Sequence, residues 1–177
     1  MKKFSTRSIV FLGLMAAVSI VLTRLLSVTV DPATLRLSLG NVPIVLVSLW
    51  FGPIEGAAVG FIADLIGASV FSPYGWNPLL APYAVIMGLL PALIRKAFLK
   101  NISGFLQILF VTLLTNCAGT IAYGSFALAK MSNLSYFYVL SIRLPVYVVV
   151  AAVEAVCIYY IGKSGIDKFV FANQNKQ

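Results

Sequence analysis

Residues 136–162 read YFYVLSIRLPVYVVVAAVEAVCIYYIG and contain only two charged side chains, Arg143 and Glu154. An α-helix of ~20 mostly apolar residues is long enough to cross the ~30 Å hydrocarbon core of a bilayer. This stretch is therefore predicted to be a transmembrane helix. Five similar stretches precede it, at residues 8–26, 38–51, 54–70, 79–98 and 104–130. The sequence thus predicts an all-α integral membrane protein, a compact bundle of six transmembrane helices in a single domain over residues 1–177.

The composition argues against a soluble enzyme. Hydrophobic residues make up 60% of the chain and charged residues 10%, and histidine is absent. An ordinary soluble domain carries about 25% charged residues. Without histidine no Ser-His-Asp arrangement can form, and the sequence shows neither a nucleotide-binding loop nor a metal-ligand cluster. We therefore predict that the protein is not an enzyme and holds no metal or cofactor.

The second apolar stretch is unusually short. Residues 38–51 would reach only ~21 Å as a regular helix, because each residue adds ~1.5 Å. Such a helix does not span the bilayer alone. We expect its outer end to be irregular or to lie beneath the loop formed by residues 27–37.

The distribution of Lys and Arg predicts the orientation of the bundle. With both termini on one side, that side carries nine of the 13 basic residues, namely Lys2, Lys3, Arg7, Arg95, Lys96, Lys100, Lys163, Lys168 and Lys176. The other side carries Arg24, Arg36, Lys130 and Arg143. Because cytoplasmic loops are enriched in Lys and Arg, both termini are predicted to be cytoplasmic. Topology and contact with the anionic lipid bilayer then account for the net charge of +8, and nucleic acid is not a predicted partner.

A few charged residues lie within or next to the apolar stretches, where each is costly unless it faces a partner or a cavity. Asp64 is near the middle of the third stretch, Arg143 is in the outer half of the sixth, and Arg36 precedes the second. One interpretation is a structural ion pair of Asp64 with Arg36 or Arg143. The other is a ligand cavity open to the outside, in which the two arginines bind anionic groups and Asp64 binds a donor-rich group. Asn41 either caps the second helix or contacts the same ligand.

Aromatic and amide side chains gather in the same outer half. The candidates for ligand contact are Tyr74, Trp76, Asn77 and Tyr83. Tyr and Trp are also enriched at membrane interfaces, so an interfacial belt explains the aromatic rings equally well. Trp76 and Asn77 are the strongest candidates, because the prolines on either side restrict the turn that presents them.

Small residues in the first stretch form a possible contact surface. Gly13 and Ala17 are four residues apart, and Ala16 and Ile20 lie beside them. Small residues at this spacing allow helices to approach closely. The stripe either packs within the bundle or docks onto another membrane protein.

Several of these motifs resemble one transporter family. The run LRLSLGNVPI at residues 35–44 and the run FGPIEG at residues 51–56, followed by Gly60 and Asp64, are similar to the second and third helices of substrate-binding (S) components of energy-coupling factor vitamin transporters. The stretch LRLSLGN and the PYGWNP loop at residues 73–78 most resemble the folate-specific members. The family often has Ala-x-x-x-Ala in its first helix, where this chain has Gly13 and Ala17.

The resemblance implies a function. An S component in a bacterial plasma membrane captures its vitamin, here folate or a related pterin, and then associates with a coupling membrane protein and two ATPase subunits. It implies that the outer-half candidates bind the vitamin and that the stripe of the first helix docks on the coupling protein. Two alternatives remain open. The chain is an S component for another vitamin, or it is a stand-alone proton-coupled carrier that uses Asp64 or Glu154.

Overall fold

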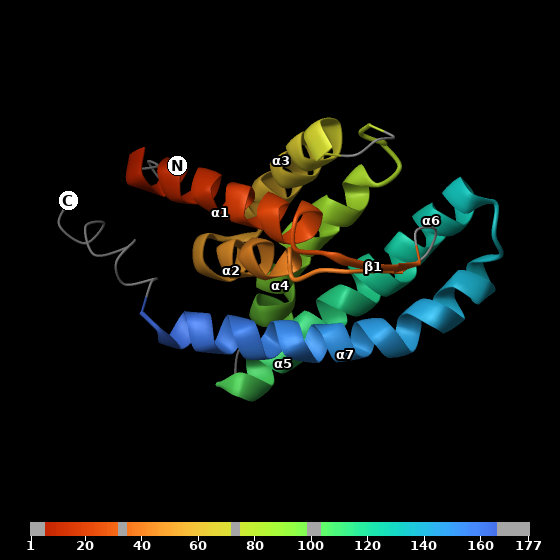
Figure 1. The fold of residues 1–177 in the computed structure, drawn as a ribbon. Helices are drawn as coiled ribbons and strands as arrows, with labels where there is room; N and C mark the ends of the chain where they lie inside the picture. Colours follow the sequence, from red (N-terminus) through yellow and green to blue (C-terminus); the bar gives the residue numbers. More distant parts are fainter. Residues whose placement is uncertain (1–5, 32–34, 72–74, 99–103, 166–177) are drawn as a thin grey trace.

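The computed structural model describes residues 6–31, 35–71, 75–98 and 104–165. Within these residues, five helices are long and apolar enough to cross a membrane. They are α1 (Thr6–Arg24), α3 (Pro53–Phe71), α4 (Ala81–Phe98), the continuous segment Phe105–Ser132 and α7 (Tyr136–Lys163). A sixth apolar helix, α2 (Asn41–Phe51), is shorter. Figure 1 shows that α1 begins and α7 ends at the same end of the bundle, as the predicted topology requires.

The short helix α2 fills the interior of the bundle. Its 11 residues cover only ~16 Å, and every residue from Val42 to Ser48 is buried. The helix begins at Asn41, three residues later than predicted, and its C-terminal turn at Gly52 requires a positive φ of 134°. The Ser19 hydroxyl of α1 donates to the Gly40 carbonyl at 2.7 Å. The start of α2 is thus held inside the bundle, so the side chain of Asn41 is available to an internal site.

A short β-hairpin precedes α2 and is a feature that the predicted helical bundle did not include. Strands β1 (Val28–Asp31) and β2 (Leu35–Leu37) pair antiparallel, with Val28 opposite Leu37. Figure 1 shows the hairpin extending from the end of α1 toward α6. Leu35 is buried against Ile121 and Tyr147, so the hairpin packs on the bundle instead of forming a free link.

The fifth predicted helix is continuous but not regular. It consists of α5 (Phe105–Asn116), a π-helical segment η1 (Cys117–Tyr123) and α6 (Gly124–Ser132). Short π-helical insertions in α-helices occur frequently at functional sites, because they change the direction of side chains and the pairing of carbonyl groups. The segment η1 carries Thr120, which belongs to the site described below.

Two glycines allow α3 and α4 to touch backbone to backbone. A Cβ atom placed on Gly88 would lie 2.1 Å from the carbonyl oxygen of Gly56. We expect Gly88→Ala to lower the free energy of unfolding by about 1–3 kcal/mol, because it overpacks this contact. Thermal unfolding of the purified protein measures the effect. Gly13→Ala is the control, since a Cβ there meets no atom within 4 Å. Equal melting temperatures for the two variants would contradict the close contact between Gly56 and Gly88.

Candidate ligand-binding site

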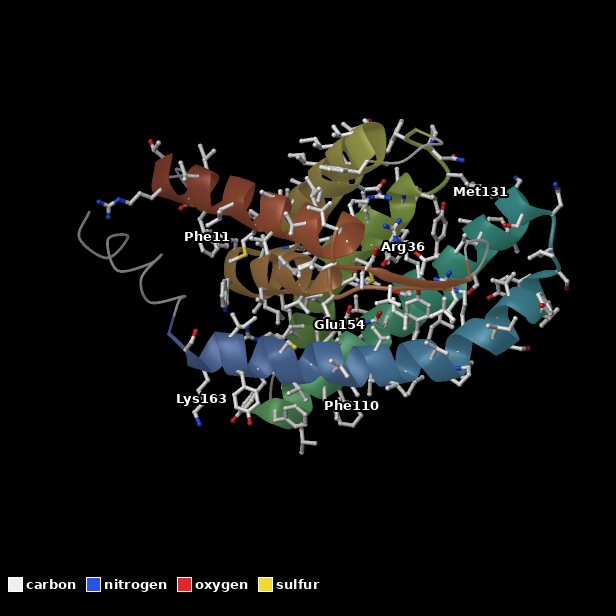
Figure 2. All side chains as sticks on the ribbon, in the orientation of Figure 1. Phe11, Arg36, Phe110, Met131, Glu154 and Lys163 are labelled. Carbon is white, nitrogen blue, oxygen red and sulfur yellow. The ribbon has the colours of Figure 1, made fainter. Side chains whose placement is uncertain are left out.

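One face of α7 brings a line of polar side chains into the bundle. Arg143, Tyr147 and Glu154 follow one another at intervals of four and seven residues, which places them on the same side of an α-helix. Arg143 is 4% exposed and Glu154 is 0% exposed. Figure 2 shows Glu154 among the helices in the interior, whereas Lys163 lies at the end of α7. Charged groups buried this deeply need specific partners or a ligand.

The Glu154 carboxylate is anchored on one oxygen only. Its Oε2 accepts a hydrogen bond from Asn116 Nδ2 at 2.8 Å. Asn116 Oδ1 in turn accepts from the Thr120 hydroxyl at 2.9 Å, so that both ends of the amide are used. Oε1 of Glu154 is buried and makes no hydrogen bond of normal geometry within the described residues. An acceptor left unsatisfied in the interior is costly, which makes Oε1 a candidate contact for a ligand donor.

Arg143 joins α7 to the π-helical segment. Its Nη2 donates to the Thr120 carbonyl at 3.1 Å, and its guanidinium lies 4.6 Å from the centre of the Tyr147 ring. The Tyr147 hydroxyl donates to the backbone carbonyl of Arg36 at 2.7 Å, which ties β2 to α7. The hairpin is therefore fixed directly beside the guanidinium.

Asn41 and Tyr83 complete this group from α2 and α4. The Tyr83 hydroxyl donates to Asn41 Oδ1 at 3.0 Å, and the Asn41 side chain is close enough to Glu154 to interact with it. A Cβ placed on Gly124 would lie 3.2 Å from Arg143 Nη2 and 3.9 Å from Tyr83 Cδ2. The side chains that meet here are Asn41, Tyr83, Asn116, Thr120, Arg143, Tyr147 and Glu154. We call them the core polar cluster.

Asp64 belongs to a different group. Its Oδ1 lies 3.6 Å from Arg24 Nη2, at the end of α1, so the partner in this ion pair is Arg24 and not Arg36 or Arg143, as one of the two interpretations had it. The Trp76 ring packs edge-on against Phe61 of α3, with the two ring centres 6.4 Å apart. Asp64 Oδ2 and Trp76 Nε1 are both buried, and the two side chains are close enough to interact, although within the described residues neither atom makes a hydrogen bond of normal geometry. We call Arg24, Asp64 and Trp76 the outer polar group.

The remaining predicted residues lie apart from these two groups or outside the described residues. The Arg36 side chain is exposed and donates to Ser27 Oγ at 2.9 Å, although its backbone carbonyl belongs to the core region. Asn77 Nδ2 lies 3.6 Å from the sulfur of Met131, and its Oδ1 accepts from the backbone of Leu79. Tyr74 falls outside the described residues.

Five residues of these groups were not among the predicted site residues. They are all polar residues of apolar helices, namely Arg24, Asn116, Thr120, Tyr147 and Glu154. Asn116 and Thr120 are spaced by one helical turn. An intramembrane carboxylate such as Glu154 is itself a signal of function. That signal points to this residue but gives no information on which helices surround it.

The small residues of α1 divide between two faces. Ala16 is 6% exposed and belongs to the core, and Ile20 is partly buried against that core, which favours packing within the bundle for these two residues. Gly13 and Ala17 are exposed, and a Cβ on Gly13 would meet no atom within 4 Å. Large apolar side chains are exposed on either side of them, including Val10, Leu14, Val18 and Val21.

The sequence model of the ECF-type riboflavin transporter S component family matches residues 3–164. The chain belongs to this family of S components. With its apolar helices, this S component is a multi-pass membrane protein of a transport system and not an enzyme.

Relatives with known ligands support the family assignment. The folate transporter FolT of Leuconostoc mesenteroides is 35% identical over 71 residues, which are 40% of this S component and 37% of that relative. The alignment thus spans little more than a third of the length of that relative. A crystal structure of FolT bound with folic acid superposes with a TM-score of 0.72 and 25% identity, over 90% of this chain and 94% of that one.

A second solved structure shows the shared fold. The S component for biotin from an ECF-type ABC transporter superposes with a TM-score of 0.65, at 20% identity, over 88% of this chain and 90% of that one. The predicted helical bundle is therefore the S-component fold, and in this chain it includes the short buried α2 and the hairpin that precedes it.

Proposed function

We propose that this S component is the folate-binding subunit of an energy-coupling factor transporter in a bacterial plasma membrane. It captures folate from the outside and passes it to a coupling membrane protein and two ATPase subunits, which supply the energy. The observation that carries the proposal is the likeness to folate-bound FolT over 90% of the chain. The separate sequence match to a folate transporter supports it.

The core polar cluster suits the pterin ring of folate. The amino edge of a pterin carries adjacent N–H donors, and Glu154 Oε1 is a buried acceptor that makes no hydrogen bond of normal geometry within the described residues. Because Asn116 holds the other carboxylate oxygen at 2.8 Å, the carboxylate is already oriented for a ligand. Hydrogen bonds to a charged group contribute about 1.5–3 kcal/mol each. Two of them would supply about a quarter to a half of the ~12 kcal/mol that nanomolar binding requires.

Other polar groups complement the rest of the ligand. Arg143, held between the Thr120 carbonyl and the Tyr147 ring, would donate to the ring carbonyl of the pterin. In the outer polar group, Asp64 Oδ2 offers an acceptor and Trp76 Nε1 a donor, and neither makes a hydrogen bond of normal geometry within the described residues. Arg36 is exposed on the hairpin, where it would meet the carboxylates of the glutamate tail by charge attraction from the surface.

Mass spectrometry of the small molecules that co-purify with the protein tests this proposal. We expect folate or a reduced folate in about one copy per chain, because nanomolar ligands survive purification in detergent. The protein is expressed without any coupling subunit or ATPase, since capture by itself requires neither. Recovery of riboflavin or biotin in place of folate would contradict the assignment of the ligand but not the family.

A further inference from the structure

A separate hollow opens at the end of the bundle where α7 terminates. It has a volume of about 110 Å³ and lies among α2, α4, α5 and α7. Its walls are mostly apolar and include Leu46, Ile108, Val111 and Ile158. Arg95, Gln107 and Gly162 also line it. We call it the inner cleft, because the distribution of Lys and Arg predicts that this end faces the cytoplasm.

The polar side of the inner cleft is cationic. Arg95 is exposed, and its Nη1 donates to the Leu49 carbonyl at 3.3 Å, which holds the guanidinium at the opening. A guanidinium has five N–H donors, so this bond leaves most of them for another acceptor. Lys96 and Lys163 are exposed at the same end of the bundle. Among the described residues that line the cleft, none is acidic.

We propose that the inner cleft binds one anionic phospholipid, with the phosphate on Arg95 and the adjoining part of an acyl chain between the apolar walls. The cleft is cationic at its opening and apolar inside. It therefore complements a phospholipid of the inner leaflet, whose anionic phosphate is followed by apolar acyl chains. Basic pockets between transmembrane helices on the cytoplasmic side are known to suit anionic headgroups. The planar guanidinium also matches the geometry of a phosphate better than a lysine does.

This lipid site is independent of the folate site. Glu154 and Ile158 are neighbours on one face of α7. Glu154 is fully buried and does not line the inner cleft, whereas Ile158 does, so the two sites share no side chain. Failure of the folate assignment would therefore leave the lipid proposal intact. Melting temperature, and not ligand affinity, is the appropriate control for folding.

Native mass spectrometry of the full chain with phosphatidylglycerol and with phosphatidylcholine of the same acyl chains tests the proposal. We expect the wild type to retain one phosphatidylglycerol about tenfold more strongly than phosphatidylcholine, and Arg95→Ala to lose this preference. Lys96→Ala is the matched control, since Lys96 is the next residue and does not line the cleft. It should behave as the wild type.

A second variant tests the cleft itself. Gly162→Phe should fill the opening without damage to the fold, because a Cβ there meets no atom within 4 Å. We expect it to lose retention of both lipids at an unchanged melting temperature. Equal losses in Arg95→Ala and Lys96→Ala would show diffuse charge attraction and overturn the proposal. It would also be overturned if Gly162→Phe kept the lipid but lost assembly with a coupling protein, because the cleft would then be a protein-docking surface.

Discussion

Replacement of Glu154 by Gln is expected to weaken folate binding by about 100-fold, equivalent to about 2.8 kcal/mol, while the fold remains intact. The amide oxygen of Gln would still accept from Asn116, which now donates to Glu154 Oε2 at 2.8 Å. The amide NH2 would then occupy the place of Oε1, which is buried and makes no normal hydrogen bond within the described residues. A donor there would oppose the donors of the pterin. Calorimetric titration of wild type and variant with folate measures the difference.

Graded controls separate this effect from a general loss of charge. Asp64→Asn should weaken binding by about tenfold, since Asp64 already shares its charge with Arg24. Arg36→Ala should change affinity less, because its side chain is exposed. Full folate affinity in Glu154→Gln, at an unchanged melting temperature, would move the pterin out of the core polar cluster.

The double variant Gly13→Leu with Ala17→Leu is expected to abolish ATP-driven folate uptake in vesicles while it leaves folate affinity unchanged. Both residues are exposed on α1, and a side chain on Gly13 would meet no atom of the protein within 4 Å. Bulk at these positions would therefore block only the approach of another helix. The coupling protein should also fail to co-purify with the variant.

Ala16→Leu is the matched control, because Ala16 lies beside Gly13 and Ala17 on the same helix but is buried. Ala16 is 6% exposed and packs in the core with Ile44 and Val59, so the larger side chain should lower the melting temperature. The contrast between the two variants distinguishes docking from internal packing. Normal uptake by the Gly13 and Ala17 double variant would rule out this face of α1 as the coupling surface.

The helices could be predicted from the sequence because bilayer thickness sets their length. The short second helix followed from the same arithmetic, since 14 residues cannot cross as a regular helix. The hairpin was missed, although Val28 to Val30 alternates as a strand does and a proline follows at position 32. A two-stranded hairpin is only marginally stable by itself, and here Leu35 and Tyr147 hold it in place.

The site could be predicted only in part, because a sequence does not show which helices are neighbours. Arg143, Asn41 and Tyr83 were identified as costly or amphipathic residues, and the fold brings them together. Arg24 was not considered as a partner of Asp64, because a sequence does not show that the end of α1 lies beside α3 at that depth. The π-helical segment η1 has no composition signal in Cys117–Tyr123, so the pairing of the Thr120 carbonyl with Arg143 could not be foreseen.

Calorimetry of the isolated protein with folic acid, riboflavin and biotin tests the central claim most directly. The protein is purified without coupling partner or ATP and titrated with each vitamin in turn, with Glu154→Gln measured alongside. The folate assignment predicts a single folate site of about nanomolar affinity, no comparable heat from riboflavin or biotin, and a clear loss of affinity in the variant. Tight binding of riboflavin or biotin with no heat from folate would contradict it.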